Sequence, residues 1–272
     1  MPADPARRPQ RAGLIADLLP PAVAAVESAG HLPEPGPVLF PVEEAVMHSA
    51  GPRRRAEFAA GRLCARAALA RLGVPAAPIL PGPAGQPRWP AGVTGSITHC
   101  AGYRACAVAR TTDVAAIGID AEPDAALPAG LIDMVATGPE RAWIRRHAAT
   151  RRGAGVAGAG LPDARVPAAG PRGAGVPGAG PRGAGVPGAA PPAVCWDRLL
   201  FSAKEAACKL WYPLTGQWPG LRAAVIGLAT TGTFTVCLPG PGPGAGDRPT
   251  TRLTGRWLAS GGLIVTAIAW TP

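Results

Sequence analysis

The sequence predicts an α/β (α+β) protein made of two small halves, on the basis of three observations. A repetitive segment rich in Gly, Pro, Ala and Arg, residues 151–193, divides the chain. Helical and strand-like patterns occur before this segment and again after it. With 272 residues, 47% of them hydrophobic, the chain can bury a substantial core. We therefore expect an N-terminal extension at 1–34, a first half at 35–150 and a second half at 194–272.

The first half is expected to combine helices with short strands. An apolar face predicts a helix over 53–72, which ends where Gly and Pro follow. A Gly- and Pro-rich loop comes next, at 78–90. Continuous apolar runs predict buried strands at 105–109 and 115–119, and a helical stretch at 131–146 completes this half.

The second half is expected to consist of one helix followed by four strands. The helix is predicted over 203–211, with Pro213 ending it because proline disrupts helical hydrogen bonding. The four strand-like segments are 224–228, 233–238, 251–258 and 263–270.

The dividing segment contains the block Gly-Pro-Arg-Gly-Ala-Gly-Val-Pro-Gly-Ala at 170–179 and again, unchanged, at 180–189. Gly and Pro dominate it and aromatic residues are absent, so it can bury too little apolar surface to offset the entropy of ordering. It also lacks the strict three-residue glycine period of collagen. We interpret 151–193 as a disordered insertion, a kind of loop whose length adds little closure entropy.

Composition argues against several classes of protein. No stretch is apolar for long enough to span a membrane, and the N-terminus lacks a clean signal-peptide core. The six cysteines form no CxxC pair, and the four histidines show no metal-ligand spacing. The net charge of +10 is concentrated in the N-terminal tail, the dividing segment and residues 53–71, without the interleaved aromatics of a base-stacking surface. We expect a cytoplasmic protein that contacts neither membrane nor nucleic acid.

Lys204 and Lys209 are the only lysines among 27 basic residues, and they lie five positions apart. An ammonium group is a compact point charge that suits phosphate oxygens. The pair therefore indicates a phosphate site, although chance on a lysine-poor chain would give the same spacing.

Three carboxylates are candidates for a metal or base site. Asp120 and Glu122 follow a buried strand, and residues two apart in a strand point to the same side. Such a pair suits Mg²⁺, but two solvated acids at a strand end would look the same. Glu205 could complete the site, or it could pair with Lys209 or form a capping box with Ser202.

Further phosphate-binding candidates lie in the first half. The Thr98 hydroxyl and His99 belong to a small polar stretch just before a predicted strand, where backbone amides could also bind a phosphate oxygen. Arg54 and Arg62 lie near two helical turns apart and could share one helix face. The alternatives are a structural histidine and arginines on an exposed helix.

Five motifs follow one another along the chain, at Glu57–Arg66, Gly85–Pro90, Gly95–Cys100, Ile117–Pro123 and Phe201–Ala206. Together they resemble the motifs of 4′-phosphopantetheinyl transferases, of the Sfp type and its enterobactin-synthase component D branch. The resemblance covers about residues 35–150 and 194–270.

The resemblance implies a pseudo-twofold pair of small α/β halves, with coenzyme A and the active site in the cleft between them. It implies Mg²⁺ on the coenzyme A diphosphate, held by Asp120 and Glu122, with Glu205 as third carboxylate or general base. The serine of an apo carrier protein would attack the β-phosphate and release 3′,5′-ADP. Fatty-acid, polyketide and non-ribosomal peptide carriers are the partners it implies, and we expect a monomer.

The same resemblance assigns roles to the basic residues. It makes Arg54, Arg62 and His99 phosphate clamps. It places Lys204 and Lys209 in catalysis and coenzyme A binding, where they neutralise charge near the diphosphate.

One loop departs from the family pattern. The branch commonly has lysine between residues 79 and 90, but this chain has none there, and Arg88 is the expected substitute. A non-catalytic protein that binds coenzyme A or another nucleotide is therefore the alternative function.

Overall fold

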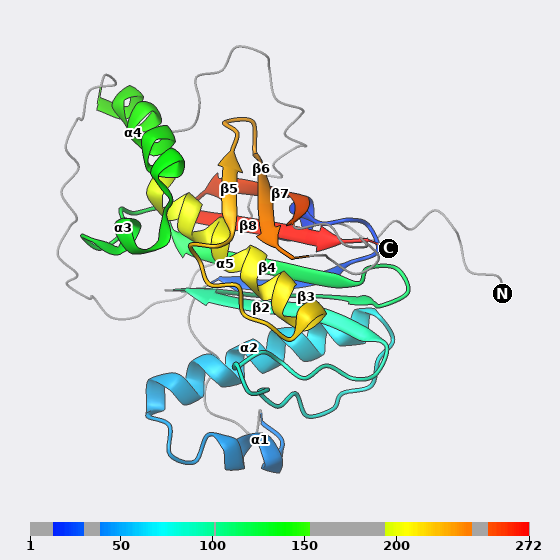
Figure 1. Cartoon of the computed structure of the whole chain (residues 1–272). Coiled ribbons are helices and arrows are strands. Elements are labelled where there is room, and N and C mark those ends of the chain that lie inside the picture. Colours follow the sequence, from blue (N-terminus) through cyan, green and yellow to red (C-terminus); the bar gives the residue numbers. More distant parts are fainter. Residues whose placement is uncertain (1–12, 30–38, 101, 153–193, 241–249, 272) are drawn as a thin grey trace, which may run out of the picture.

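The computed structural model of the chain describes residues 13–29, 39–100, 102–152, 194–240 and 250–271. Within them the strands form two antiparallel sheets flanked by helices, which confirms the α/β class (Figure 1). The smaller sheet has the order β1-β3-β2 and the larger sheet the order β4-β8-β7-β6-β5. The insertion predicted over 151–193 lies outside the described residues from 153 onward, and a pseudo-twofold relation between the halves stays a prediction.

The smaller sheet joins β1 (Ala24–Ala29), β3 (Tyr103–Arg110) and β2 (Val93–Cys100). The long helix α2 (Pro52–Arg71) packs against it through small alanine and cysteine side chains. A proline opens this helix, at a position where the missing N–H is not needed. The helix predicted over 53–72 is confirmed.

The described part of the expected N-terminal extension belongs to this smaller sheet. β1 pairs with β3 along its whole length. The carboxylate of Glu27 in β1 accepts hydrogen bonds from the amides of Leu14 and Ile15, at 2.6 and 3.0 Å, and from the Tyr103 hydroxyl at 2.7 Å. Residues 13–29 are therefore part of the first half rather than an appendage to it.

The larger sheet contains β4 (Ala116–Pro123), β8 (Leu263–Trp270), β7 (Thr250–Ser260), β6 (Thr233–Pro239) and β5 (Val225–Leu228). All four strands predicted for the second half are confirmed. β4 comes from the segment assigned to the first half, yet it pairs with β8 along its whole length, up to the partners Pro123 and Leu263. The larger sheet therefore crosses the boundary that the sequence predicts.

Two buried hydroxyls in β2 connect the two sheets. The amide of Ile119 donates to Ser96 Oγ at 3.2 Å, and the amide of Ala121 donates to Thr98 Oγ1 at 3.0 Å. The polar stretch at 95–100, expected just before a strand, is itself part of strand β2. Its hydroxyls can be buried there because they accept hydrogen bonds from backbone amides of β4. The contact sets Thr98 of the smaller sheet directly beside Asp120 of the larger one.

Helix α5 (Trp196–Thr215) lies against the larger sheet (Figure 1). It extends beyond the predicted 203–211 at both ends, because Pro213 falls in its last turn and Gly216, with φ +69°, ends it instead. The helix approaches β4 so closely that a Cβ atom at Gly118 would lie 1.9 Å from the Ala206 carbonyl oxygen. α5 therefore contacts the strand that contains Asp120 without any side chain between them.

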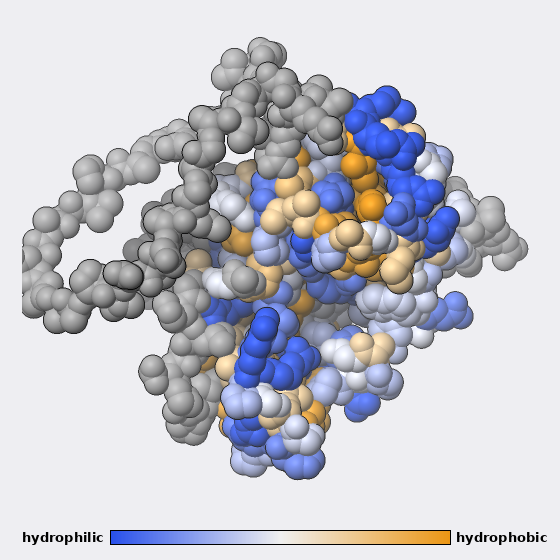
Figure 2. Space-filling model, turned by 90° about the vertical axis from the view of Figure 1, so that its left-hand side faces the viewer, coloured by the Kyte–Doolittle hydropathy of each residue, from blue (hydrophilic) through white to orange (hydrophobic). Residues whose placement is uncertain are grey.

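The remaining helical elements are a 3₁₀ turn at Ala16–Leu18, α1 (Pro41–Val46), α3 (Leu131–Val135) and α4 (Gly138–Arg152). The helical stretch predicted at 131–146 is thus two helices, α3 and α4. On the side that faces the viewer in Figure 2, hydrophilic residues surround smaller hydrophobic areas. Among the described residues, no helix is both long and apolar enough to cross a bilayer.

Candidate active site

Three elements bring their polar side chains together at Asp120. Asp120, a residue that is 4% exposed, sits in β4 between β2 and α5. Its Oδ1 lies 2.6 Å from Lys209 Nζ of α5 and accepts a hydrogen bond from Thr98 Oγ1 of β2 at 3.2 Å. Lys209 also donates to the carbonyl of Ile119, at 3.4 Å. The sequence predicted that Thr98, Asp120 and Lys209 belong to one site, and the structure brings them into contact.

The second carboxylate oxygen of Asp120 has no partner among the residues that the structure describes. Oδ2 is buried and makes no hydrogen bond within the described part of the chain. A buried anionic oxygen without a partner is costly, unless a ligand or cation completes its environment. This oxygen therefore marks the point at which a further positive group fits the site.

Glu205 lies one helical turn before Lys209, half-buried and without a hydrogen bond to any described residue. Burial raises the pKa of Glu205, the ammonium of Lys209 offsets part of this, and the charge of Asp120 raises it further. The proposed capping box with Ser202 is wrong, because Ser202 lies inside α5 and its Oγ is 2.9 Å from Thr266 Oγ1. A surface pair with Lys209 is also absent, since that ammonium contacts Asp120 instead.

Glu122 is engaged by an arginine that the sequence analysis missed. Arg198 Nη1 lies 2.9 Å from Glu122 Oε2, while Nε and Nη2 donate to the carbonyls of Ala125 and Ala126 at 3.0 and 2.8 Å. Burial raises the pKa of Glu122, as does Asp120, and Arg198 acts in the opposite direction. The predicted helix began only at residue 203. A prediction that began at Trp196 would have placed Arg198 on the same helix as Glu205.

The carboxylates fit a hard cation but do not form a finished cage. In the part of the chain that the structure describes, no group of three or more His, Cys, Asp or Glu side chains is arranged to hold a metal ion. The charge of Asp120 nevertheless raises the pKa of both Glu122 and Glu205, so Asp120 interacts electrostatically with each of them. Mg²⁺ takes one or two carboxylates and completes its shell with water and phosphate, so the free Oδ2 of Asp120 suits it.

Lys204 does not reach this cluster. Its side chain is fully buried, and Nζ lies 2.8 Å from Glu140 Oε1 and 2.6 Å from the Ala224 carbonyl oxygen. Burial lowers the pKa of Lys204, and Glu140 counteracts this. A direct catalytic or coenzyme A-binding role for Lys204 is therefore contradicted, since its ammonium has no exposed surface with which to meet a phosphate.

Arg62 is likewise engaged inside the first half. It is 6% exposed, donates from Nε to the Ile79 carbonyl at 2.8 Å, and places its guanidinium 3.9 Å from the centre of the Phe58 ring. Burial lowers its pKa to about 10. The expected role of Arg62 as a phosphate clamp is not supported, because the residue holds the loop before β2 against α2.

Arg54, His99 and Arg88 are exposed, as phosphate-binding residues should be. Desolvation lowers the pKa of His99, the carboxylates of Glu57 and Asp120 raise it, and the positive charges of Arg54 and Lys209 lower it further, so His99 senses charges on both α2 and α5. Arg88 lies in the loop after Gln86, where its backbone amide donates to the Leu80 carbonyl at 2.8 Å. Nothing in the structure links the Arg88 side chain to the cluster.

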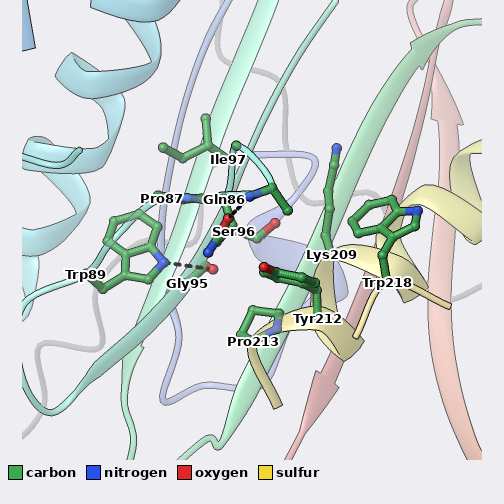
Figure 3. Close-up of a pocket in the computed structure, with 12 residues that line it drawn as sticks. Gln86, Pro87, Trp89, Gly95, Ser96, Ile97, Lys209, Tyr212, Pro213 and Trp218 are labelled. Carbon is green, nitrogen blue, oxygen red and sulfur yellow. Dashed lines mark hydrogen bonds between the residues drawn. The ribbon is translucent and has the colours of Figure 1, made fainter. Parts of the chain in front are cut away.

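A pocket of about 370 Å³ opens beside the cluster, between the loop before β2 and the C-terminal part of α5 (Figure 3). One side is formed by the 84–89 loop and β2, where Trp89 Nε1 donates to the Gly95 carbonyl at 3.0 Å. Tyr212 and Trp218 lie on the other side. Lys209 lines the pocket and also contacts Asp120, so the pocket and the carboxylates form one continuous site.

Comparison with known proteins identifies the family. A profile of the 4′-phosphopantetheinyl transferase N-terminal domain matches residues 42–109. The chain is 43% identical to 4′-phosphopantetheinyl transferase Svp of Streptomyces mobaraensis over 258 residues, which is 94% of this chain and 89% of the relative. It is 38% identical to 4′-phosphopantetheinyl transferase PptT of Mycobacterium tuberculosis over 239 residues, 86% and 87% of the two chains.

The likeness to the enterobactin branch is local. Enterobactin synthase component D of Salmonella typhi is 42% identical over 76 residues, which is 28% of this chain and 30% of the relative. The two transferases above instead match over most of both chains. The protein is thus an enzyme, and the chain belongs to the 4′-phosphopantetheinyl transferase family.

Proposed function

We propose that the enzyme moves the 4′-phosphopantetheine arm of coenzyme A to a serine of an apo carrier protein, with Mg²⁺ as cofactor. The observation that supports this most is the contact between Lys209 and Asp120 at the edge of the pocket. It sets an ammonium, a carboxylate with a free oxygen and the half-buried Glu205 around one point. Phosphoryl-type transfer needs such positioning and charge neutralisation more than covalent help from the protein.

The chain's own side chains supply the acid–base and electrostatic parts of the reaction. The carrier serine oxygen forms a bond to the β-phosphorus, and the bond from that phosphorus to the bridging oxygen breaks. 3′,5′-ADP leaves with the electron pair, and Glu205 accepts the serine proton. The raised pKa of Glu205 suits this task, because a base is most effective when its pKa approaches the working pH.

Charge on the diphosphate is countered from the neighbouring elements. Lys209 faces the diphosphate from α5, while Arg54 and His99 meet phosphate oxygens from α2 and β2. Asp120 and Glu122 would hold Mg²⁺, which when bound neutralises negative charge on the diphosphate, and Glu205 stays free to act as the base. Arg198 keeps Glu122 in place from the opposite side.

The pocket beside Lys209 receives a part of coenzyme A that does not react. Trp89, Tyr212 and Trp218 give it aromatic walls, and Gln86 adds an amide. Binding energy from such a remote part can position the diphosphate over the carboxylates. Arg88 is the arginine available to replace the lysines that are absent from the adjoining loop.

The direct test is incorporation of a fluorescent pantetheine arm from labelled coenzyme A into a panel of apo carriers. The panel should contain fatty-acid, polyketide and non-ribosomal peptide carriers, each also as its Ser→Ala variant. We expect labelling that requires Mg²⁺, stops with a chelator and is absent from the Ser→Ala variants. Tight coenzyme A binding with no labelling of any carrier would instead establish the non-catalytic alternative.

A further inference from the structure

Glu140 lies at a junction of three elements, away from the carboxylate cluster. It is 5% exposed, and its Oε2 accepts hydrogen bonds from the amide and hydroxyl of Thr137, at 2.6 and 2.9 Å, where α4 begins. Its Oε1 accepts a hydrogen bond from the amide of Ile226 in β5 at 2.7 Å and lies 2.8 Å from Lys204 Nζ in α5. One carboxylate therefore ties α5 to the start of α4 and to the edge of the larger sheet.

Lys204 lies on a different side of α5 from the residues that face the site. With 3.6 residues per turn, Glu205 is rotated from Lys204 by about 100° and Lys209 by about 140°. Glu205 and Lys209 thus share one side of the helix. The contact between Lys204 and Glu140 lies on a different side. Any rotation of α5 that moves Lys204 must also move both site residues.

Other contacts of α5 act on other sides of the helix. The Gly118–Ala206 approach sets the distance between α5 and β4, and the hydroxyls of Ser202 and Thr266 meet at 2.9 Å. The Lys204–Glu140 contact lies on a separate side of the helix and has directional hydrogen bonds. Since side chains extend about 5–6 Å from a helix axis, a rotation of about 10° moves their ends by about 1 Å.

We propose that Glu140 is a positioning residue: by holding Lys204, it fixes the rotation of α5 and so directs Glu205 and Lys209 towards Asp120. This rests on the proposed function of that cluster. Such a role gives a reason for a fully buried ion pair, which offers little stability over apolar residues of similar size. A displacement of about 1 Å at reacting groups can cost about 10²-fold in rate, so a small rotation is enough to matter.

Four variants separate positioning from stability: Lys204→Met, Glu140→Gln, the double variant that combines them, and Glu43→Gln as a control. Lys204→Met leaves the Glu140 carboxylate buried without its cation, so both thermal stability and kcat should fall. Adding Glu140→Gln removes the unpaired charge but keeps an acceptor for the Ile226 amide. We expect the double variant to regain most of the lost melting temperature, while kcat stays about 10²-fold below wild type. Mn²⁺ affinity, measured by paramagnetic resonance of the free ion, should stay weakened as well.

The chain offers a closely matched control in the first half. Glu43 is also buried, accepts a hydrogen bond from the amide of Phe40 at the start of α1, and accepts another from the amide of Ile79 in a distant segment. It pairs with Arg66 of α2 at 3.1 Å. Glu43→Gln should lower the melting temperature about as much as Glu140→Gln, yet leave kcat and Mn²⁺ affinity unchanged.

Recovery of kcat together with melting temperature in the double variant would overturn the proposal, as would an equal loss of kcat in Glu43→Gln. The Mn²⁺ measurement keeps the positioning role separate from the proposed function. If wild type transfers no pantetheine, yet Glu140→Gln weakens Mn²⁺ binding and Glu43→Gln does not, the positioning role stands and the transferase assignment falls. If wild type neither transfers pantetheine nor binds Mn²⁺, both are refuted.

Discussion

A methyl group at Gly118 tests whether the contact between α5 and β4 sets the geometry of the site. In Gly118→Ala the new Cβ would lie 1.9 Å from the Ala206 carbonyl oxygen and 2.9 Å from the Leu210 amide nitrogen. Both are helix backbone, so no flexible side chain can yield. Ordinary contact begins at 3.4 Å, and the helix and strand must therefore separate by about 1.5 Å.

This separation acts directly on the cluster. Asp120 lies two residues after Gly118 on β4, and Lys209 lies one turn after Ala206 on α5. Their contact of 2.6 Å would lengthen to about 4 Å, beyond hydrogen-bonding distance. Overpacking of this kind costs about 1–3 kcal/mol of unfolding free energy, and the misplaced groups should lower kcat by about 10²-fold or more.

Calorimetry and steady-state transfer kinetics measure the two effects. Gly138→Ala is the matched control, because a Cβ there has nothing within 4 Å and lies at the start of α4. That change should be neutral or stabilise by up to about 1 kcal/mol, with unchanged kcat. Wild-type stability and wild-type kcat in Gly118→Ala would refute the argument that this contact positions the site.

Three further predictions concern Glu205, the repeat at 180–189 and Arg62. Because the pKa of Glu205 is raised in the folded protein, the unfolded chain loses that proton first as pH rises, and the charged form opposes folding. Glu205→Gln should therefore raise the melting temperature at pH 7, with the gain vanishing below about pH 4.3; a constant gain across pH would contradict this. Removing residues 180–189 should leave melting temperature and kcat unchanged, since the first turn of α5 is held independently by Asp124, Asp197 and Arg198; a loss of kcat would give the repeat a role in the site. Arg62→Lys should lower unfolding free energy by about 1–2 kcal/mol, because it weakens the stack on Phe58 and the bond to Ile79, whereas unchanged stability by urea titration with a raised KM for coenzyme A would restore the phosphate role.

The strands of the second half could be predicted from sequence because their apolar pattern is local. The segment predicted at 263–270 matches β8, and its neighbours differ by one or two residues. β2 was not predicted as a strand, since its buried Ser96 and Thr98 look polar until β4 supplies the amides that they bind. The first seven residues of α5, 196–202, were not predicted to be helical, although the helix begins at Trp196.

For the site, too, local sequence patterns could nominate residues, but they could not show which distant residues those would contact. Residue type and spacing sufficed to nominate Asp120, Glu205 and Lys209. Composition made Lys204 and Lys209 look equivalent, yet they lie about 140° apart around the helix and face different partners. Only the packed structure shows that Lys204 meets Glu140 of α4.

We propose that Glu205 acts as the base in pantetheine transfer at the Asp120 cluster. Intact mass spectrometry of an apo carrier, incubated with coenzyme A, Mg²⁺ and either wild type or Glu205→Gln, measures this most directly. Circular dichroism should first confirm that the variant is folded. We expect wild type to add the mass of one phosphopantetheine to the carrier, and Glu205→Gln to add it at least about 10²-fold more slowly. Equal rates for the two proteins would contradict it.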